Sequence, residues 1–127
     1  MKTRTLLFKV ILAIGAITVV SGFVQLVAPN IVLGVVGGES TPTSRHFFAI
    51  VGMFMVLFGG MLCHALLSAG AEHVAVLWAG LQKFGAAGAV SVGAVIGIFS
   101  WMAMSVAAFD LFSGILIVWY WLSVKPS

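Results

Sequence analysis

The sequence predicts an all-α integral membrane protein, in which four transmembrane helices form an antiparallel bundle with both termini in the cytoplasm. Of its 127 residues, 62% are hydrophobic and only 7% are charged. Soluble domains carry about 25% charged residues, so too few charges remain here to cover a water-exposed surface. The apolar residues also form four stretches near the roughly 20 residues that a membrane-spanning helix needs. At this length a single domain, residues 1–127, is expected.

The first predicted span is Leu6–Val27, and it follows the basic start Met1–Arg4. A basic start before an apolar run is also typical of a signal peptide. The run is longer than the roughly 7–15 apolar residues of a signal peptide, and Lys9 interrupts it. We therefore expect this stretch to remain as a span, which Pro29 and Asn30 end.

A loop and a second span are predicted next. The segment Ile31–Val36 is apolar but too short to cross a bilayer, so we expect it to lie in the membrane interface. Glycines and a proline then predict a loop. Thr43 or Ser44 can cap the following helix, whose predicted span is Phe47–Ala69.

The third and fourth predicted spans, Ala75–Ser100 and Trp101–Leu122, are nearly continuous. A tight turn must separate them if both cross the membrane. We expect this turn near Phe99–Met102, where a serine and a tryptophan interrupt the apolar run.

Basic residues set the expected orientation, because cytoplasmic loops carry an excess of Lys and Arg. Most of the basic residues lie near the two ends of the chain: Lys2, Arg4, Lys9 and Lys125. Both ends and the loop Gly70–Val74 are therefore predicted inside, and Pro29–Arg45 outside. The expected location is the cell membrane, with the bacterial inner membrane preferred.

One carboxylate is predicted near the middle of the bilayer. Asp110 lies about 13 Å below the expected outer edge, at about 1.5 Å per residue. A charge at that depth costs at least about 2.5–3.5 kcal/mol, so it must face protein or water. Small residues share its helix face, which favours the protein side: Ala103, Ala107, Ser113 and Gly114.

Lys83 lies at a similar depth in the third span and is the expected partner of Asp110, with Gln82 assisting. Our preferred interpretation is structural: the pair fixes how spans three and four dock. A proton or ion relay is the second, because ionisable groups inside membranes are functional candidates. In the third, Lys83 extends to the inner interface and Asp110 is protonated and alone.

Two further groups of residues are candidates for packing or binding. Small residues recur every four positions in the third span and predict close helix packing, either at the bundle centre or at a subunit interface: Gly85, Ala89, Gly93 and Gly97. At the outer edge we expect Gln25, Arg45 and His46 to lie close together. They are interfacial anchors, or else Arg45 binds an anionic head group or a quinone carbonyl.

Several function classes find no support in the sequence. Paired carboxylates, a Ser-His-Asp set and a phosphate loop are missing, so we do not expect an enzyme. Cys63 and His64 are adjacent and point about 100° apart on a helix, so no metal site is predicted. The net charge of +3 has no basic face to carry it, which argues against nucleic acid.

Four segments of the chain resemble the small four-helix membrane proteins of the DoxX-like group: GFVQLVAPNIVLGVVGG, RHFFAIVGMFMVLFGG, LWAGLQKFGAAGAV and FDLFSGILIVWYW. They share a proline-ended first span, an Arg and Gly at the head of the second, and an Asp in the fourth. Some members are tied to thiosulfate:quinone oxidoreduction as a membrane subunit. The resemblance implies the fold and an outer Arg45. A single cysteine leaves thiol redox chemistry unsupported.

The expected function is therefore a non-catalytic structural or accessory subunit, without a required cofactor. Its expected partners are the lipid bilayer and other membrane subunits or copies of itself. The first alternative is a DoxX-like redox-associated subunit with a quinone or lipid head-group pocket near Arg45. The second is a small transporter or channel that uses Asp110 and Lys83.

Overall fold

The computed structural model describes residues 2–68 and 73–124, and the regular secondary structure in this part of the chain is all helical. The elements, in chain order, are α1 (Lys2–Val27), α2 (Pro29–Val36), α3 (Pro42–Leu67), α4 (His73–Val95) and α5 (Ala103–Ser123). Among these described helices, four are long and apolar enough to cross a membrane, and α2 is too short. The all-α class and the number of candidate spans are thus confirmed, and the chain is a multi-pass membrane protein.

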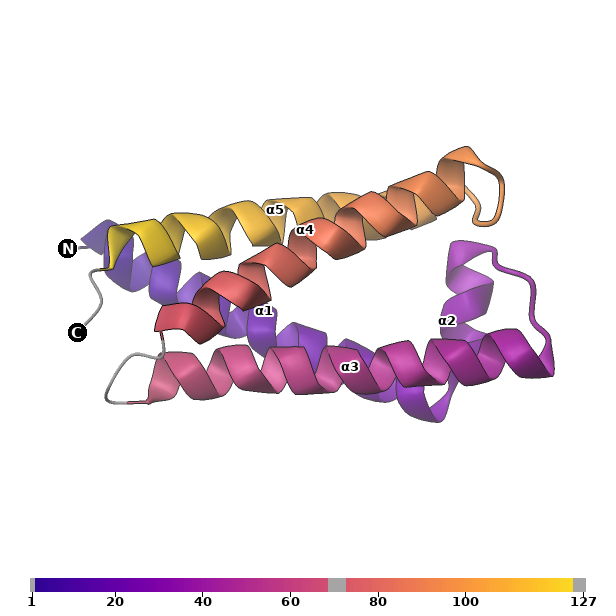
Figure 1. Cartoon of the computed structure of the whole chain (residues 1–127), viewed down its shortest axis with the longest axis horizontal. Coiled ribbons are helices and arrows are strands. Elements are labelled where there is room, and N and C mark those ends of the chain that lie inside the picture. Colours follow the sequence, from indigo (N-terminus) through magenta and orange to yellow (C-terminus); the bar gives the residue numbers. More distant parts are fainter. Residues whose placement is uncertain (1, 69–72, 125–127) are drawn as a thin grey trace.

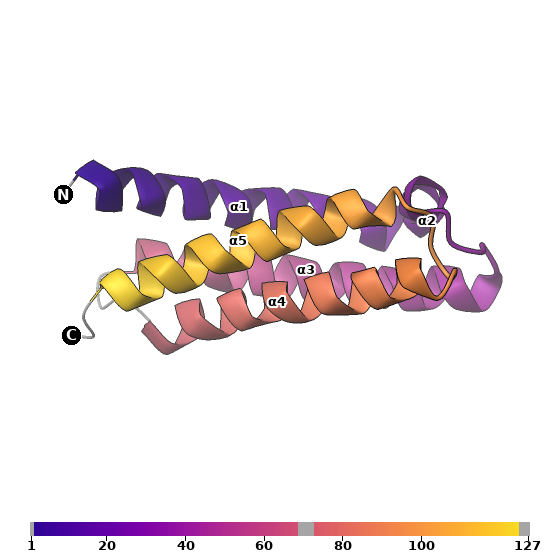
Figure 2. The same ribbon diagram turned by 90° about the horizontal axis from the view of Figure 1, so that it is seen from above.

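The long helices form two pairs. Helix α1 packs mainly on α3 and α4 mainly on α5, with fewer contacts between the pairs. Successive long helices run in opposite directions, so that α1 begins and α5 ends at the same end of the molecule (Figure 1). Figure 2 shows the same arrangement from above, with α2 lying across the far end of the bundle. We call that far end the α2 end.

Glycines set how closely α1 and α3 approach each other. A Cβ atom on Gly22 would lie 2.7 Å from the carbonyl oxygen of Gly52, and one on Gly52 would lie 2.6 Å from the nitrogen of Leu26. Farther along the pair, a Cβ on Gly59 would lie 2.8 Å from the carbonyl oxygen of Gly15. Only hydrogen fits at these positions, so the two backbones pack directly against each other.

Helix α2 is short because of the residues at its ends. Pro29 occupies the first turn, where its fixed φ suits a helix and its missing N–H costs nothing. Gly37 ends the helix with a φ of 72°, a left-handed conformation that glycine adopts without strain. The N–H of Gly38 then donates to the carbonyl of Leu33 at 2.9 Å and closes the last turn.

Helix α3 starts earlier than the sequence predicted. Its N-cap is Thr41, whose hydroxyl accepts from the N–H of Ser44 at 3.0 Å while the Ser44 hydroxyl accepts from the N–H of Thr41 at 2.8 Å. Thr43 and Ser44, the expected caps, lie inside the helix. Pro42 explains the shift, because proline is favoured in the first turn and moves the start ahead of Phe47.

The connection between α4 and α5 is longer than predicted. The expected spans 75–100 and 101–122 adjoin each other, whereas the segment Ile96–Met102 separates the two helices. Gly97 has a φ of 84°, which a right-handed helix does not accommodate, so α4 ends before it. The predicted end of the second span at Ala69, most of the loop Gly70–Val74 and Lys125 lie outside the described residues.

Two apolar clusters form the core, and the space between them positions the site. The larger cluster joins all four long helices toward the end where α1 begins: Leu7, Ile11, Ile14, Leu62, Ala65, Val76, Ala79 and Ile117. The smaller one lies at the α2 end and contains Val36, Ala94 and Ala103. Lys83 and Asp110 fall between the two clusters along α4 and α5.

Candidate functional site

Lys83 is the centre of a buried polar cluster that three helices form. From α4, its Nζ donates to the Thr18 hydroxyl of α1 at 2.7 Å. The same Nζ forms an ion pair with Oδ1 of Asp110 on α5 at 3.5 Å. Lys83 and Thr18 are only 5% and 3% exposed. The lysine therefore connects α4 both to its own partner α5 and to the other helix pair.

The Thr18 hydroxyl is oriented to receive the lysine. It donates to the carbonyl of Ile14, one turn earlier in α1, at 2.8 Å. Since its hydrogen is used there, its lone pairs remain free to accept from the Lys83 ammonium. The Phe109 ring lies 5.6 Å from Nζ and adds a cation–π contact.

The two contacts of the ammonium are unequal. Charge-assisted N–H···O bonds are typically about 2.7–2.9 Å long. The distance to Thr18, 2.7 Å, lies in that range, whereas the distance to Asp110, 3.5 Å, is longer. Thr18 therefore fixes the position of the ammonium, while Asp110 supplies the opposite charge. Both are needed because a buried charge is costly without partners.

The structure places Lys83 and Asp110 together and leaves the third expected member apart. The side chain of Gln82 is half-buried and makes no hydrogen bond to the described residues. Ser113 lies one turn from Asp110, is fully buried, and its hydroxyl finds no partner within the described part of the chain. The arrangement can hold helices together, and it places one titratable pair in the middle of the spans.

The small residues of α4 do not share one packing surface. Gly85 and Ala89 are exposed, and a Cβ on Gly85 would meet no atom of the described residues within 4 Å. Gly93 packs against Phe99, while Gly97 lies beyond the end of α4. Each four-residue step overshoots a turn by about 40°, so a repeat of four drifts around the helix. The exposed members face away from the bundle centre.

Each of the three outer-edge candidates makes its own contacts, and they share no hydrogen bond among the described residues. Gln25 is buried and donates from Nε2 to the carbonyl of Phe48 at 3.0 Å, which connects α1 to α3. Arg45 donates from Nη1 to the Ser40 hydroxyl at 3.1 Å, and His46 is exposed. A groove of about 700 Å³ opens at the α2 end, and none of these three described residues lines it.

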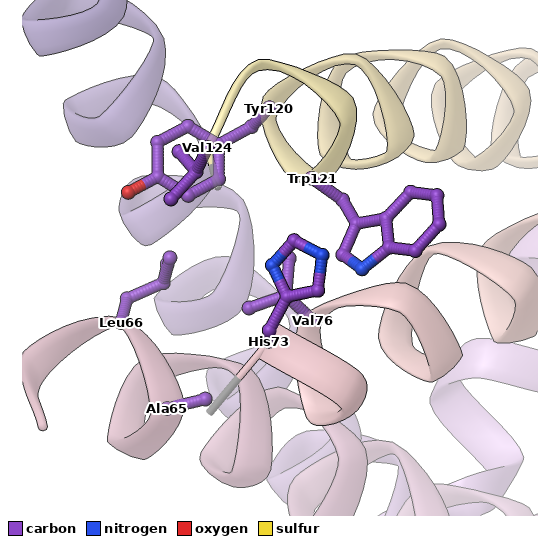
Figure 3. A pocket seen from close by; sticks show the side chains of 7 residues that line it. All are labelled: Ala65, Leu66, His73, Val76, Tyr120, Trp121 and Val124. Atoms are coloured by element: carbon purple, nitrogen blue, oxygen red, sulfur yellow. The ribbon is translucent and has the colours of Figure 1, made fainter. Parts of the chain in front are cut away.

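A small cavity lies at the opposite end, between α3, α4 and α5 (Figure 3). Its volume is about 30 Å³, enough for one water molecule. The rings of His73 and Trp121 lie 5.0 Å apart at its edge. The indole nitrogen of Trp121 is buried and has no hydrogen-bond partner in residues 2–68 and 73–124. A single bound water would satisfy this donor.

Over the described ranges, no group of three His, Cys, Asp or Glu side chains could hold a metal ion. Comparison of the chain with protein-family models, with curated proteins and with solved structures finds no match. The interpretation of the site therefore depends on its own geometry.

Proposed function

We propose that this chain is a non-catalytic membrane subunit that assembles with other membrane proteins or with copies of itself. In this proposal Lys83 holds the two helix pairs together as one rigid body, with both termini in the cytoplasm of a bacterial inner membrane. The observation that carries it is the position of the lysine ammonium, bound at once to Thr18 of one pair and Asp110 of the other.

The use of polar groups supports a structural role. Lys83, Thr18 and Gln25 are buried, and the side chain of each takes part in a hydrogen bond to another helix. A path for ions would need further polar groups at successive depths along the bundle. Ser113 is a single additional hydroxyl on the same face as Asp110. The cluster is thus better suited to fixing helix positions than to conducting.

The outward face of α4 supports assembly. Gly85, Gly88 and Ala89 are exposed there, and Cβ atoms on the two glycines would meet no described atom within 4 Å. Such a surface lets the backbone of another transmembrane helix approach closely. Exposed small residues do not contribute to packing within this chain. Contact with a transmembrane helix of a neighbouring subunit would explain why they are there.

A double-mutant cycle tests the role of Lys83. Lys83→Met and Asp110→Asn should each lower the free energy of unfolding by about 3–5 kcal/mol, because each strands a buried polar partner. The double variant should lose less than the sum, since no unpaired charge remains. Unfolding in mixed detergent micelles, followed by circular dichroism, measures all three. Gln82→Leu is the matched control and should change little, and strict additivity of the two single changes would refute the pairing.

Assembly is tested by the mass of the purified protein in a mild detergent. A homo-oligomer, or other membrane proteins in fixed stoichiometry, is the expected result, and a monodisperse monomer would contradict the proposal. Gly88→Leu should weaken the assembly without unfolding the chain. Gly60→Leu is the matched control, because Gly60 also has no described atom within 4 Å of its Cβ position but lies on α3.

A second candidate function is a proton-linked transporter, which the location of the Lys83–Asp110 pair between the two apolar clusters favours. It predicts that Asp110→Asn leaves the bundle folded and abolishes proton flux into vesicles, measured with a pH-sensitive dye. The resemblance to the DoxX-like group would instead assign a quinone or lipid site near Arg45. Quinone extracted in fixed ratio from the purified protein would favour that role.

A further inference from the structure

The groove at the α2 end is open and large enough for a small organic ligand. It runs between the end of α2, the start of α3 and the segment Ile96–Met102. Its volume of about 700 Å³ falls in the range of about 300–1,000 Å³ that small-molecule sites occupy. Ser100 fixes two of its walls relative to each other, because its N–H and hydroxyl both donate to the Val36 carbonyl, at 2.8 and 3.1 Å.

Aromatic rings form much of the lining. Phe47, Phe48 and Phe99 all border the groove, together with Leu33 and Ile98. The rings of Phe48 and Phe99 meet edge to face, with centroids 6.3 Å apart. Phe47 is 62% exposed. The groove therefore offers an apolar surface and π faces to a ligand.

The charge on the lining is negative and uncompensated. Glu39 borders the groove, and the nearby Arg45 donates to Ser40 instead of pairing with it. Within residues 2–68 and 73–124, Lys83 and Asp110 form the one ion pair, so Glu39 is not part of any. The Ser44 hydroxyl donates to the main-chain carbonyl of Glu39 at 2.7 Å and holds this part of the loop in place. The main chain at Glu39 is thus held in place, while its carboxylate is exposed and has no ion-pair partner among the described residues.

We propose that the groove binds a small organic cation with an apolar body. The Glu39 carboxylate would pair with the positive centre, and the phenylalanine rings would contact the body and add cation–π attraction. An anion would meet the carboxylate at close range with no basic group on the lining to offset it. This site lies apart from the Lys83 cluster, and it does not depend on the proposed subunit role.

Two ions of the same shape and opposite charge test the proposal. Tetraphenylphosphonium and tetraphenylborate are dialysed to equilibrium against the purified protein in a non-ionic detergent, with empty micelles as the background. The expected result is saturable binding of the cation, one per chain, with the borate partitioning as it does into empty micelles. Equal binding of both ions would overturn the proposal, as would a tightly held phospholipid that the cation cannot displace.

Variants of exposed residues identify the site without endangering the fold. Glu39→Gln should weaken cation binding by about two- to fivefold, and Glu39→Asp should retain most of it, because only the first removes the charge. Phe47→Leu should weaken binding by several-fold through the lost ring. An unchanged unfolding transition shows that each variant is intact. Undiminished binding by Glu39→Gln would refute the assignment of the carboxylate.

Discussion

Replacing Gly52 with alanine adds one methyl group where α3 crosses α1. The new Cβ would lie 2.6 Å from the nitrogen of Leu26, 2.7 Å from the carbonyl oxygen of Gly22 and 2.9 Å from the carbonyl carbon of Gln25. All three are main-chain atoms of a helix, so none can rotate away. Ordinary contacts between such atoms are about 3.5–4.0 Å, and the helices must therefore separate locally by about 1 Å.

That separation has a definite cost. Overpacking a tight interface typically destabilises a protein by about 1–3 kcal/mol. The substitution also stabilises the helix itself by about 0.5–1 kcal/mol, because alanine is a better helix former than glycine. The expected net loss for Gly52→Ala is therefore about 0–2.5 kcal/mol, whereas its deficit relative to a glycine-to-alanine change in open space is the full amount of about 1–3 kcal/mol. Gly60 lies on the same helix, and a Cβ there would meet no described atom of another helix within 4 Å. Gly60→Ala should therefore only raise the free energy of unfolding, by about 0.5–1 kcal/mol.

The free energy of unfolding in mixed detergent micelles, followed by circular dichroism in the helix bands, measures both variants. The difference between them isolates the interhelical contact, because the change in helix propensity is the same. If Gly52→Ala proves as stable as Gly60→Ala, then α1 and α3 do not pack backbone to backbone, and the reasoning is refuted.

Two further variants test the contacts that join the helix pairs. Thr18→Val keeps the side-chain shape but removes the acceptor 2.7 Å from Lys83 Nζ, so the free energy of unfolding in mixed micelles should fall by about 1.5–3 kcal/mol. An unchanged free energy of unfolding would mean that Asp110 alone holds the lysine. Gly37→Ala forces a φ of 72° on an L-residue and places its Cβ 2.6 Å from the Cβ of Ser100, so a loss of at least about 1–2 kcal/mol is expected. Gly34→Ala is the control, and equal stability of these two alanine variants would contradict the docking of α2 on the α4–α5 connection.

The number of candidate spans was predictable because hydropathy is a local property of the chain. The helix ends were less so, since they depend on capping geometry. The start of α3 follows from Thr41 and Pro42 together, a pattern visible in the sequence but outweighed by the later start of the apolar run. The end of α4 follows from the left-handed conformation of Gly97, which the sequence alone does not distinguish from a helical glycine.

The site was predictable only where it follows from the position of residues along each span. Lys83 and Asp110 could be matched by depth, because depth follows from counting residues along each span. Thr18 was missed because the choice of neighbour for α4 is made by tertiary packing. A signal did exist: Thr18 continues the buried positions of Leu7, Ile11 and Ile14, spaced alternately by four and three residues. A hydroxyl on such an apolar stripe indicates a polar partner across the interface.

The glycines at which α1 and α3 pack together also have a regular spacing in the sequence, but the repeat in α4 is easier to notice. Gly15 and Gly22 are seven residues apart, as are Gly52 and Gly59, and a spacing of seven stays on one helix face. The four-residue repeat in α4 was more conspicuous, but it drifts around the helix. Spacing that matches on two different spans is therefore the better indicator of where their backbones meet.

The order of the residues along the chain bears on how the lysine enters the bilayer during synthesis. A nascent chain is made from its N-terminus, so Thr18 is already present when α4 is produced, whereas Asp110 follows Lys83 by 27 residues. At about 5–20 residues per second, that interval lasts about 1–5 s. An unpaired charge would be costly in the bilayer throughout that time. If α4 meets α1 before α5 is made, the Thr18 hydroxyl can accept from the ammonium until Asp110 becomes available.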